Sequence, residues 1–179
     1  SLREYNHWIL QILNMHEAIP GHYAQLVYAN RSPSLVKSLF GNGAMVEGWA
    51  VYGERMMLES GYGGNEPEMW LMYSKWNLRS VTNAILDYGV HVLGMSEAEA
   101  MDLLTRQSFQ TRAEASEKWR RVQLSSVQLS SYFSGYSEIM ELREQRKQAL
   151  GPKFDLKAFH EQFLSYGSAP VRMIKELMR

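Results

Sequence analysis

The chain has 179 residues, of which 45% are hydrophobic and 12% aromatic, so it fits one domain and can bury a sizeable core. Nineteen basic residues balance nineteen acidic ones, and no net field would draw the protein to nucleic acid or to an anionic membrane surface. There is no cysteine, which excludes disulfides, thiolate metal ligands and a cysteine nucleophile. Any bound metal must therefore be held by His, Asp or Glu.

No segment has the pattern of a membrane span or of an export signal. The longest apolar runs are far short of the roughly 20 residues that a membrane helix needs, and the N-terminus lacks a basic region followed by an apolar stretch. Because the chain opens on SLREYNHW, a pattern typical of the inside of a helix, we expect a fragment of a longer protein whose targeting signal would not be visible. The compartment, cytoplasmic or exported, and the oligomeric state stay open.

The first part of the chain has helical periodicity. Apolar residues recur at helical spacing over residues 2–30 and are interrupted once, at Pro20 and Gly21, which predicts one long helix with a kink. Residues 31–44 mix Pro, Gly and Ser around a short apolar piece, which predicts a loop with one helical turn. A second helix is expected over residues 45–59.

After a break at GYGGNEP, an aromatic-rich helical pattern resumes. It predicts a third helix over residues 68–93 that Gly94 ends. Ser96 and Glu99 form a capping box, in which a hydroxyl and a carboxylate satisfy free backbone donors at a helix start. A short helix to about Arg106 is expected to follow.

The last third of the chain is also predicted to be helical. Residues 114–150 form one long helical pattern closed by Gly151, and Asp155 is placed to cap a further helix through Tyr166, before a last short one. No segment alternates like a strand, and no repeat or linker divides the chain. We therefore expect a single all-α unit over residues 1–179.

The clearest chemical signal is the motif HEAIPGH. A hydrolytic zinc site needs two neutral imidazoles, a third ligand that is often a carboxylate, and a base to deprotonate water. The usual HExxH spacing is lengthened here, because His22 follows His16 by six residues and would point about 120° away on an ideal helix. Pro20 lacks an amide hydrogen and Gly21 tolerates unusual backbone angles, so a bulge there could bring the imidazoles together.

Three glutamates complete the expected site, whose metal is one zinc ion. Glu17, beside His16, is the expected catalytic base. Glu47 and Glu54 are seven residues apart in MVEGWAVYGE and share a helix face. We expect Glu47 to be the third ligand and Glu54 to orient one of the histidines. Two alternatives are that the histidines are unrelated and that both later glutamates lie on a solvated face.

Two further groups could serve the reaction. Asp87 and His91 have the i, i+4 spacing that lets a carboxylate orient an imidazole, which could stabilise an oxyanion. Arg121, Gln128 and Tyr132 lie on one predicted helix. The Tyr hydroxyl could assist the oxyanion, and the Arg and Gln could bind a peptide backbone or a carboxylate. A capped helix-end histidine and an ordinary polar face are the alternatives.

The motifs occur together and in a fixed order. They are HEAIPGH, EGWAVYGE, DYGVH-x2-G, the stretch from Arg121 through Gln128 to Tyr132-x2-Gly135, and the final FDLKAFHEQFL-x2-G-x2-P. Over residues 2–179 this set resembles a bacterial family catalogued as domain of unknown function 885, which is grouped with the HExxH-like zinc peptidases called gluzincins. The resemblance implies a largely helical, zincin-like domain that forms the carboxyl-terminal, metal-bearing part of a considerably longer protein.

The resemblance also implies roles for single residues. It matches metal histidines to His16 and His22, the base to Glu17, the acidic ligand to Glu47, and the family's DxGxH to Asp87 and His91. The chain departs from the family where the family often has an Arg-Tyr pair and a Pro-Gly before the Gln, since Val122 follows Arg121 and Ser126 precedes Val127. The lost hydroxyl affects the expected substrate preference more than the metal.

We therefore expect metal-dependent hydrolysis of a peptide or a related small amide. In this scheme zinc at the two histidines and Glu47 polarises a water, Glu17 takes its proton, and His91 with Tyr132 stabilises the oxyanion. Two alternatives stay open. One is a metal-dependent hydrolase of a non-peptide amide or ester, because no residue fixes the scissile group. The other is a helical binding or scaffold domain that is metal-free or inactive in isolation.

Overall fold

The computed structural model describes residues 4–178, which form helices and, within that range, no strand. The all-α prediction is confirmed, and its zincin-like detail stays a prediction. The α-helices are α1 (His7–Glu17), α2 (His22–Ala29), α3 (Leu35–Leu39), α4 (Gly43–Glu59), α5 (Pro67–Val92), α6 (Glu97–Asp102), α7 (Arg112–Leu124), α8 (Gln128–Leu150), α9 (Leu156–Ser165) and α10 (Val171–Leu177). Short 3-10 segments lie at Tyr62–Asn65 and Gly151–Lys153, and a π-helical turn at Leu103–Gln107. Across the described residues no helix has the length and apolar character to cross a membrane, as expected.

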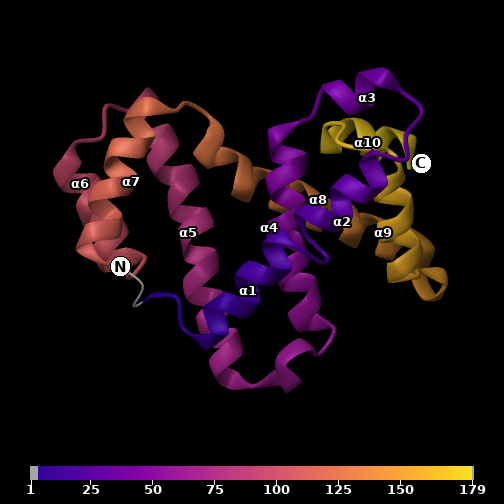
Figure 1. The fold of residues 1–179 in the computed structure, drawn as a ribbon, viewed down its shortest axis with the longest axis horizontal. Helices are drawn as coiled ribbons and strands as arrows, with labels where there is room; N and C mark the ends of the chain where they lie inside the picture. The colour runs from indigo at the N-terminus through magenta and orange to yellow at the C-terminus, as the bar shows by residue number, and fades with distance from the viewer. Residues whose placement is uncertain (1–3, 179) are drawn as a thin grey trace.

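The long helices α4, α5 and α8 form the centre of the molecule (Figure 1). Helix α8 packs against both α4 and α5, and α1 also contacts both of them. Helices α6 and α7 lie on the α5 side of the molecule, whereas α9 and α10 lie on the α4 side (Figure 1). The central helices therefore connect two flanking groups.

Three apolar clusters hold these helices together. The first joins α1 to α4 and α5 through Ile9, Ile12, Met15, Leu58, Met69 and Tyr73. The second joins α5 to α6, α7 and the start of α8 through Leu86, Ala100, Leu103, Leu104, Ala115, Val122 and Leu129. The third joins α4 and α8 to α9 and α10, and Trp49, Tyr52 and Phe163 are its largest fully buried members. Because each large buried side chain contributes about 1.5–3 kcal/mol, these clusters fix the positions of the helices.

Helices α4 and α8 cross at two glycines. A Cβ atom on Gly135 would lie 1.7 Å from the carbonyl oxygen of Ala44, and one on Gly48 would lie 2.3 Å from the backbone carbon of Gly135. Contacts this short with backbone atoms cannot be relieved by a side-chain movement. The absence of a side chain at both positions is therefore what lets the two backbones touch.

The structure corrects the expectation of one kinked helix over residues 2–30. Helix α1 ends at Glu17 and α2 begins at His22, so Pro20 and Gly21 separate two helices. The expected helix start at residue 2 lies outside the described residues. The apolar residues Tyr23 and Leu26, which continue the helical spacing beyond the break, are exposed, so the spacing of apolar residues did not mark the separation.

The long helix predicted over residues 114–150 is also two helices. Helix α7 ends at Leu124 and α8 begins at Gln128, with Val127 between them at a φ of +70°. Positive φ is unfavourable for a β-branched residue, but the amide of Val127 donates to the carboxylate of Asp87 at 3.3 Å. A distant residue thus helps to hold a turn that the local sequence does not mark.

The predicted helix ends are largely confirmed. Ser96 and Glu99 form the expected capping box, and Asp155 caps α9. Gly94, at a φ of +70°, lies just after α5. The short helix that follows ends at Asp102, earlier than expected, and continues as the π-helical turn.

Replacing Gly135 by Ala should lower the free energy of unfolding by about 1–3 kcal/mol, because the added methyl group would force α4 and α8 apart. Gly43→Ala is the matched control. A Cβ on Gly43 would meet nothing within 4 Å, so this variant should change stability by no more than about 1 kcal/mol. Urea unfolding followed by circular dichroism measures both, and equal stability of the two variants would contradict the proposed crossing.

Candidate metal centre and cavity

The loop between α1 and α2 folds back onto the end of α1. The amide of Gly21 donates to the carbonyl of Met15 at 3.0 Å, and a Cβ on Gly21 would lie 1.8 Å from the carbonyl oxygen of His16. The indole Nε1 of Trp49 donates to the carbonyl of Pro20 at 2.8 Å, which ties the loop to α4. This tight return places the first residue of α2 beside the last turn of α1.

As a result, His16, His22 and Glu47 converge. The two imidazole rings lie 4.8 Å apart, centroid to centroid, and are nearly perpendicular at 88°. The Oε2 atom of Glu47 lies 3.5 Å from Nε2 of His22 and 3.8 Å from Nε2 of His16. One ligand atom from each residue lies within 4.8 Å of the other two. The structure thus brings together the three residues that the sequence predicts as metal ligands.

This cluster fits a zinc ion. Zinc binds imidazole nitrogen and carboxylate oxygen at about 2.0–2.2 Å in a tetrahedron, so two of its ligand atoms lie roughly 3.3–3.6 Å apart. The two distances from Glu47 to the imidazoles are close to this spacing. Two histidines and one glutamate are also a donor set that hydrolytic zinc sites use, with the fourth position left for water.

Glu54 orients His16 from the side that faces away from Glu47. Its Oε1 atom lies 2.6 Å from Nδ1 of His16 and accepts a second hydrogen bond from Nε1 of Trp76 at 3.3 Å. The Glu54 side chain is fully buried, and its other oxygen has no hydrogen-bond partner among the described residues. A carboxylate that accepts the Nδ1 proton leaves Nε2 of His16 free to bind a metal.

The charges of the cluster favour a cation among these side chains. Burial would lower the pKa of His16, but the carboxylates of Glu47 and Glu54 outweigh it and raise this pKa to about 9. Burial would likewise raise the pKa of Glu47, yet its interactions with His16 and His22 lower it to about 2. For Glu54, burial dominates and raises the pKa in spite of His16.

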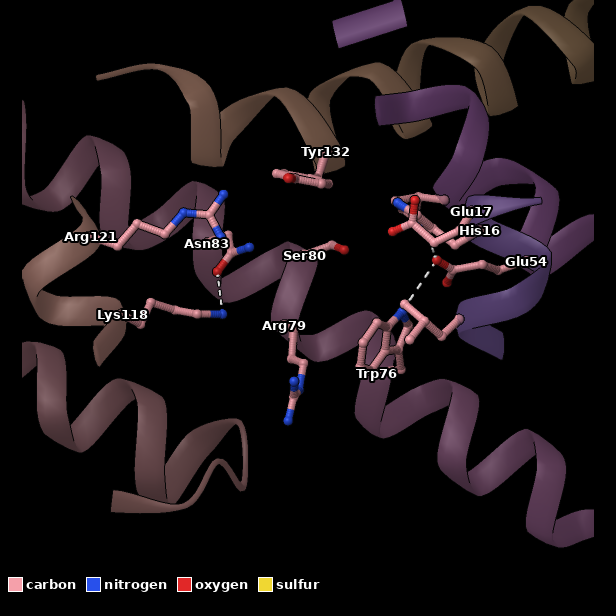
Figure 2. Close-up of a pocket in the computed structure, with 12 residues that line it drawn as sticks. His16, Glu17, Glu54, Trp76, Arg79, Ser80, Asn83, Lys118, Arg121 and Tyr132 are labelled. Carbon is pink, nitrogen blue, oxygen red and sulfur yellow. Dashed lines mark hydrogen bonds and ion pairs between the residues drawn. The ribbon is translucent and has the colours of Figure 1, made fainter. Parts of the chain in front are cut away.

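A cavity of about 240 Å³ opens beside the cluster. Figure 2 shows His16, Glu17 and Glu54 at one end of it and Asn83, Lys118 and Arg121 at the other, with Ser80 and Tyr132 between them. Glu17 is an exposed residue of the last turn of α1, next to His16 in the chain. Three residues predicted for catalysis or substrate binding, Glu17, Tyr132 and Arg121, therefore line one cavity.

Gln128, predicted to bind substrate, contacts a predicted ligand. Its Nε2 atom donates to Oε1 of Glu47 at 3.2 Å, while the other oxygen of Glu47 faces the two imidazoles. Gln128 is the first residue of α8, whereas Arg121 belongs to α7, so the two do not share a helix as expected. Its position suits a residue that holds the Glu47 carboxylate.

Asp87, predicted to orient His91, binds the start of α8. The buried carboxylate accepts hydrogen bonds from the amide of Ser130 at 2.9 Å and from its hydroxyl at 2.8 Å, besides the bond from Val127. Helix α8 has no capping side chain of its own. Asp87 therefore replaces the missing cap from another helix and fixes the turn that carries Gln128.

His91 lies outside the residues that line the cavity. Its Nε2 atom lies 2.9 Å from the carbonyl oxygen of Val122 and 2.8 Å from that of Ser125, and 3.5 Å from the Asp87 carboxylate. These contacts place the imidazole against the connection between α7 and α8. A role for His91 in stabilising an oxyanion stays a sequence prediction that this placement does not favour.

Sequence reasoning missed several residues of the cavity, notably Trp76, Ser80, Asn83 and Lys118. Trp76, Ser80 and Asn83 follow one another at helical spacing on α5. Lys118 lies one turn before Arg121 on α7. Polar residues at such spacing also occur on solvated faces. The spacing therefore indicates that these residues share a helix face, but it does not show whether that face lines a cavity or faces solvent.

The protein is thus an all-helical protein with a His-His-Glu cluster beside a polar cavity. The family model described as "Bacterial protein of unknown function (DUF885)" matches residues 1–178. The chain belongs to this family, as its motifs indicated. The comparison with curated proteins found no match.

The chain is similar to solved structures, among them the following two. A "putative lipoprotein of unknown function" from Shewanella oneidensis is 72% identical, with a TM-score of 0.96, and the match covers 99% of this chain and 32% of that one. A "putative lipoprotein" from Colwellia psychrerythraea is 28% identical, with a TM-score of 0.93 and coverages of 98% and 30%. The chain therefore spans about one third of the length of each of these proteins.

Replacing Asp87 by Ala should lower the free energy of unfolding by about 1–3 kcal/mol, because it leaves the amides at the start of α8 without their acceptor. Ser130→Ala is the control, since it removes only the hydroxyl and leaves the backbone hydrogen bond in place. Chemical denaturation compares the two variants. A loss in Asp87→Ala no larger than that in Ser130→Ala would show that the carboxylate does not cap the helix.

Proposed function

We propose that this protein is a zinc-dependent hydrolase that cleaves peptide bonds. The observation that carries the proposal is the convergence of His16, His22 and Glu47, contributed by three helices, at spacings that suit one zinc ion. The buried carboxylate of Glu54 behind His16 supports it, because metal-binding histidines commonly donate their second ring N–H to such a group. Glu17 beside the cluster supports a hydrolytic role.

The proposed mechanism assigns a step to Glu17 and to Tyr132, which both line the cavity. Zinc, when bound, supplies Lewis-acid chemistry that makes water a stronger acid and an amide carbonyl a better electrophile. Glu17 takes a proton from the attacking water and returns it to the amine as the carbon–nitrogen bond breaks. The hydroxyl of Tyr132 donates to the carbonyl oxygen as negative charge develops there. One water is consumed, and a carboxylic acid and an amine are released.

Gln128 and Glu54 act on the proposed ligands. The amide of Gln128 restrains Glu47, and Glu54 restrains His16, so two of the three ligand side chains are held before a metal arrives. Such restraint lowers the entropic cost of assembling the site. Neither residue is assigned a contact with the substrate.

The proposal extends to the location of the protein. Both similar structures carry the name "putative lipoprotein", and lipoproteins are exported and anchored by a lipid. We therefore propose that this protein works outside the bacterial cytoplasm. Fractionation of the native cells, with the protein found only in the cytosol, would contradict this part of the proposal.

Replacing Glu17 by Gln should leave one zinc ion per chain while lowering peptide turnover by roughly 10²- to 10⁴-fold, because it removes a base and not a ligand. Elemental analysis and mass spectrometry of a short-peptide library measure the two quantities. In parallel, His22→Ala should lose the metal, whereas His7→Ala, at an exposed histidine outside the cluster, should keep it. Unchanged turnover in Glu17→Gln, or unchanged zinc in His22→Ala, contradicts the mechanism.

Replacing Glu54 by Gln should weaken zinc affinity roughly 10- to 100-fold without lowering the stability of the fold. Gln has the same shape and spares the protein a fully buried carboxylate, but it is a weaker acceptor for the proton on His16. Zinc titration against a chelator of known affinity measures the first effect, and thermal unfolding the second. An unchanged zinc affinity would mean that Glu54 does not tune this histidine.

A further inference from the structure

The end of the cavity opposite the metal cluster is cationic. Lys118 and Arg121 lie one helical turn apart on α7, and Asn83 faces them from α5 (Figure 2). The ammonium of Lys118 donates to Oδ1 of Asn83 at 2.8 Å, so this hydrogen-bond partner is a neutral amide. The guanidinium of Arg121 has no ion pair or hydrogen bond within residues 4–178.

Neighbouring carboxylates do not neutralise this end. The carboxylate whose charge acts on Lys118 is that of Glu114, and it lies 2.6 Å from the guanidinium of Arg79. Burial, together with the positive charges of Arg79 and Arg121, lowers the pKa of Lys118 to about 8. A half-buried ammonium without a carboxylate partner is costly unless an anion pairs with it, and the exposed guanidinium of Arg121 adds a second donor for the same anion.

The size of the cavity limits what this anion can belong to. At about 240 Å³ the cavity is smaller than the roughly 300–1,000 Å³ typical of sites for drug-sized ligands. The cationic end and Glu17 line this same small space, so one ligand of modest size would reach both. Guanidinium and ammonium groups together bind carboxylates through short, charge-assisted hydrogen bonds.

We propose that Lys118 and Arg121, with Lys118 held by Asn83, form a binding site for a carboxylate of the substrate. The substrate class is then small peptides or N-acyl amino acids in which a carboxylate lies close to the scissile amide. This inference rests on the proposed hydrolase function for the amide, but the binding of the carboxylate does not require turnover. The carboxylate has two chemical sources, the C-terminus of a peptide and the side chain of an Asp or Glu.

The test is a binding experiment with the Glu17→Gln variant, which keeps the proposed ligands. Isothermal titration calorimetry compares N-acetyl-alanyl-alanine with its C-terminal amide. A charge-assisted contact worth about 1.5–3 kcal/mol predicts that the free acid binds roughly 10- to 100-fold more tightly. A second pair of C-terminally amidated peptides, one with Asp and one with Asn as the last residue, tests the side-chain source. The pair that shows the preference identifies the source.

Substitution of Arg121 tests whether the preference for the free acid over the amide depends on the cationic end of the cavity. In the Glu17→Gln background, Arg121→Gln should remove most of the preference for the acid, and Arg121→Lys should keep part of it. Arg120→Gln is the matched control, because Arg120 is the exposed neighbour on the same helix and does not line the cavity. Arg121 is itself exposed, so neither variant should disturb the fold, and circular dichroism checks this.

Each outcome bears on one proposal at a time. Equal or undetectable binding of acid and amide in both pairs, or the same preference in Arg121→Gln and Arg120→Gln, overturns the carboxylate site. That result leaves the hydrolase standing if Glu17→Gln has lost turnover. Conversely, a preference that depends on Arg121 in a protein whose turnover does not need Glu17 preserves the anion site and rejects the proposed mechanism.

Discussion

The candidate metal centre depends on the close packing of Gly21 against the end of α1. Any side chain at this position would overlap the carbonyl of His16, so only glycine lets the chain turn back here. The turn carries His22 to the side of His16, although six residues of uninterrupted helix would point them about 120° apart. Through Pro20 and Trp49 the turn is also tied to α4, the helix that carries Glu47 of the cluster and Glu54, which contacts His16.

The two ends of the cavity have opposite charge, and the fold keeps them apart. Glu17 lines one end, beside the cluster that contains Glu47, whereas Lys118 and Arg121 line the other. If these groups met, they would pair with one another and neither would be free to bind a ligand. The neutral Ser80 lies between them in the cavity lining, and the proposed substrate, with an amide and a carboxylate, would meet both ends (Figure 2).

The sequence could predict what rests on local pattern. Helix ends at Ser96 and Asp155 follow from capping chemistry, and the ligand cluster follows from donor types in a short motif with a proline and a glycine inside it. It could not predict features that pair residues far apart in the chain. The break at Val127 relies on Asp87, forty residues earlier, and the partner of Lys118 is thirty-five residues away. The spacing of residues within one segment does not indicate which distant residues will pair.

One face of α5 connects these long-range features. Trp76, Ser80, Asn83 and Asp87 fall within a stripe about 60° wide, since an α-helix turns about 100° per residue. Trp76 donates to Glu54 behind the candidate metal cluster, and Asn83 accepts from Lys118 at the cationic end. Asp87 caps the helix that carries Gln128 and Tyr132. Because a single helix makes all three contacts, the two ends of the cavity and the start of α8, which carries Gln128 and Tyr132, are fixed relative to one another. The spacing between the cluster and the cationic end is therefore set by α5, and under the proposed function it would select substrates by length as well as by charge.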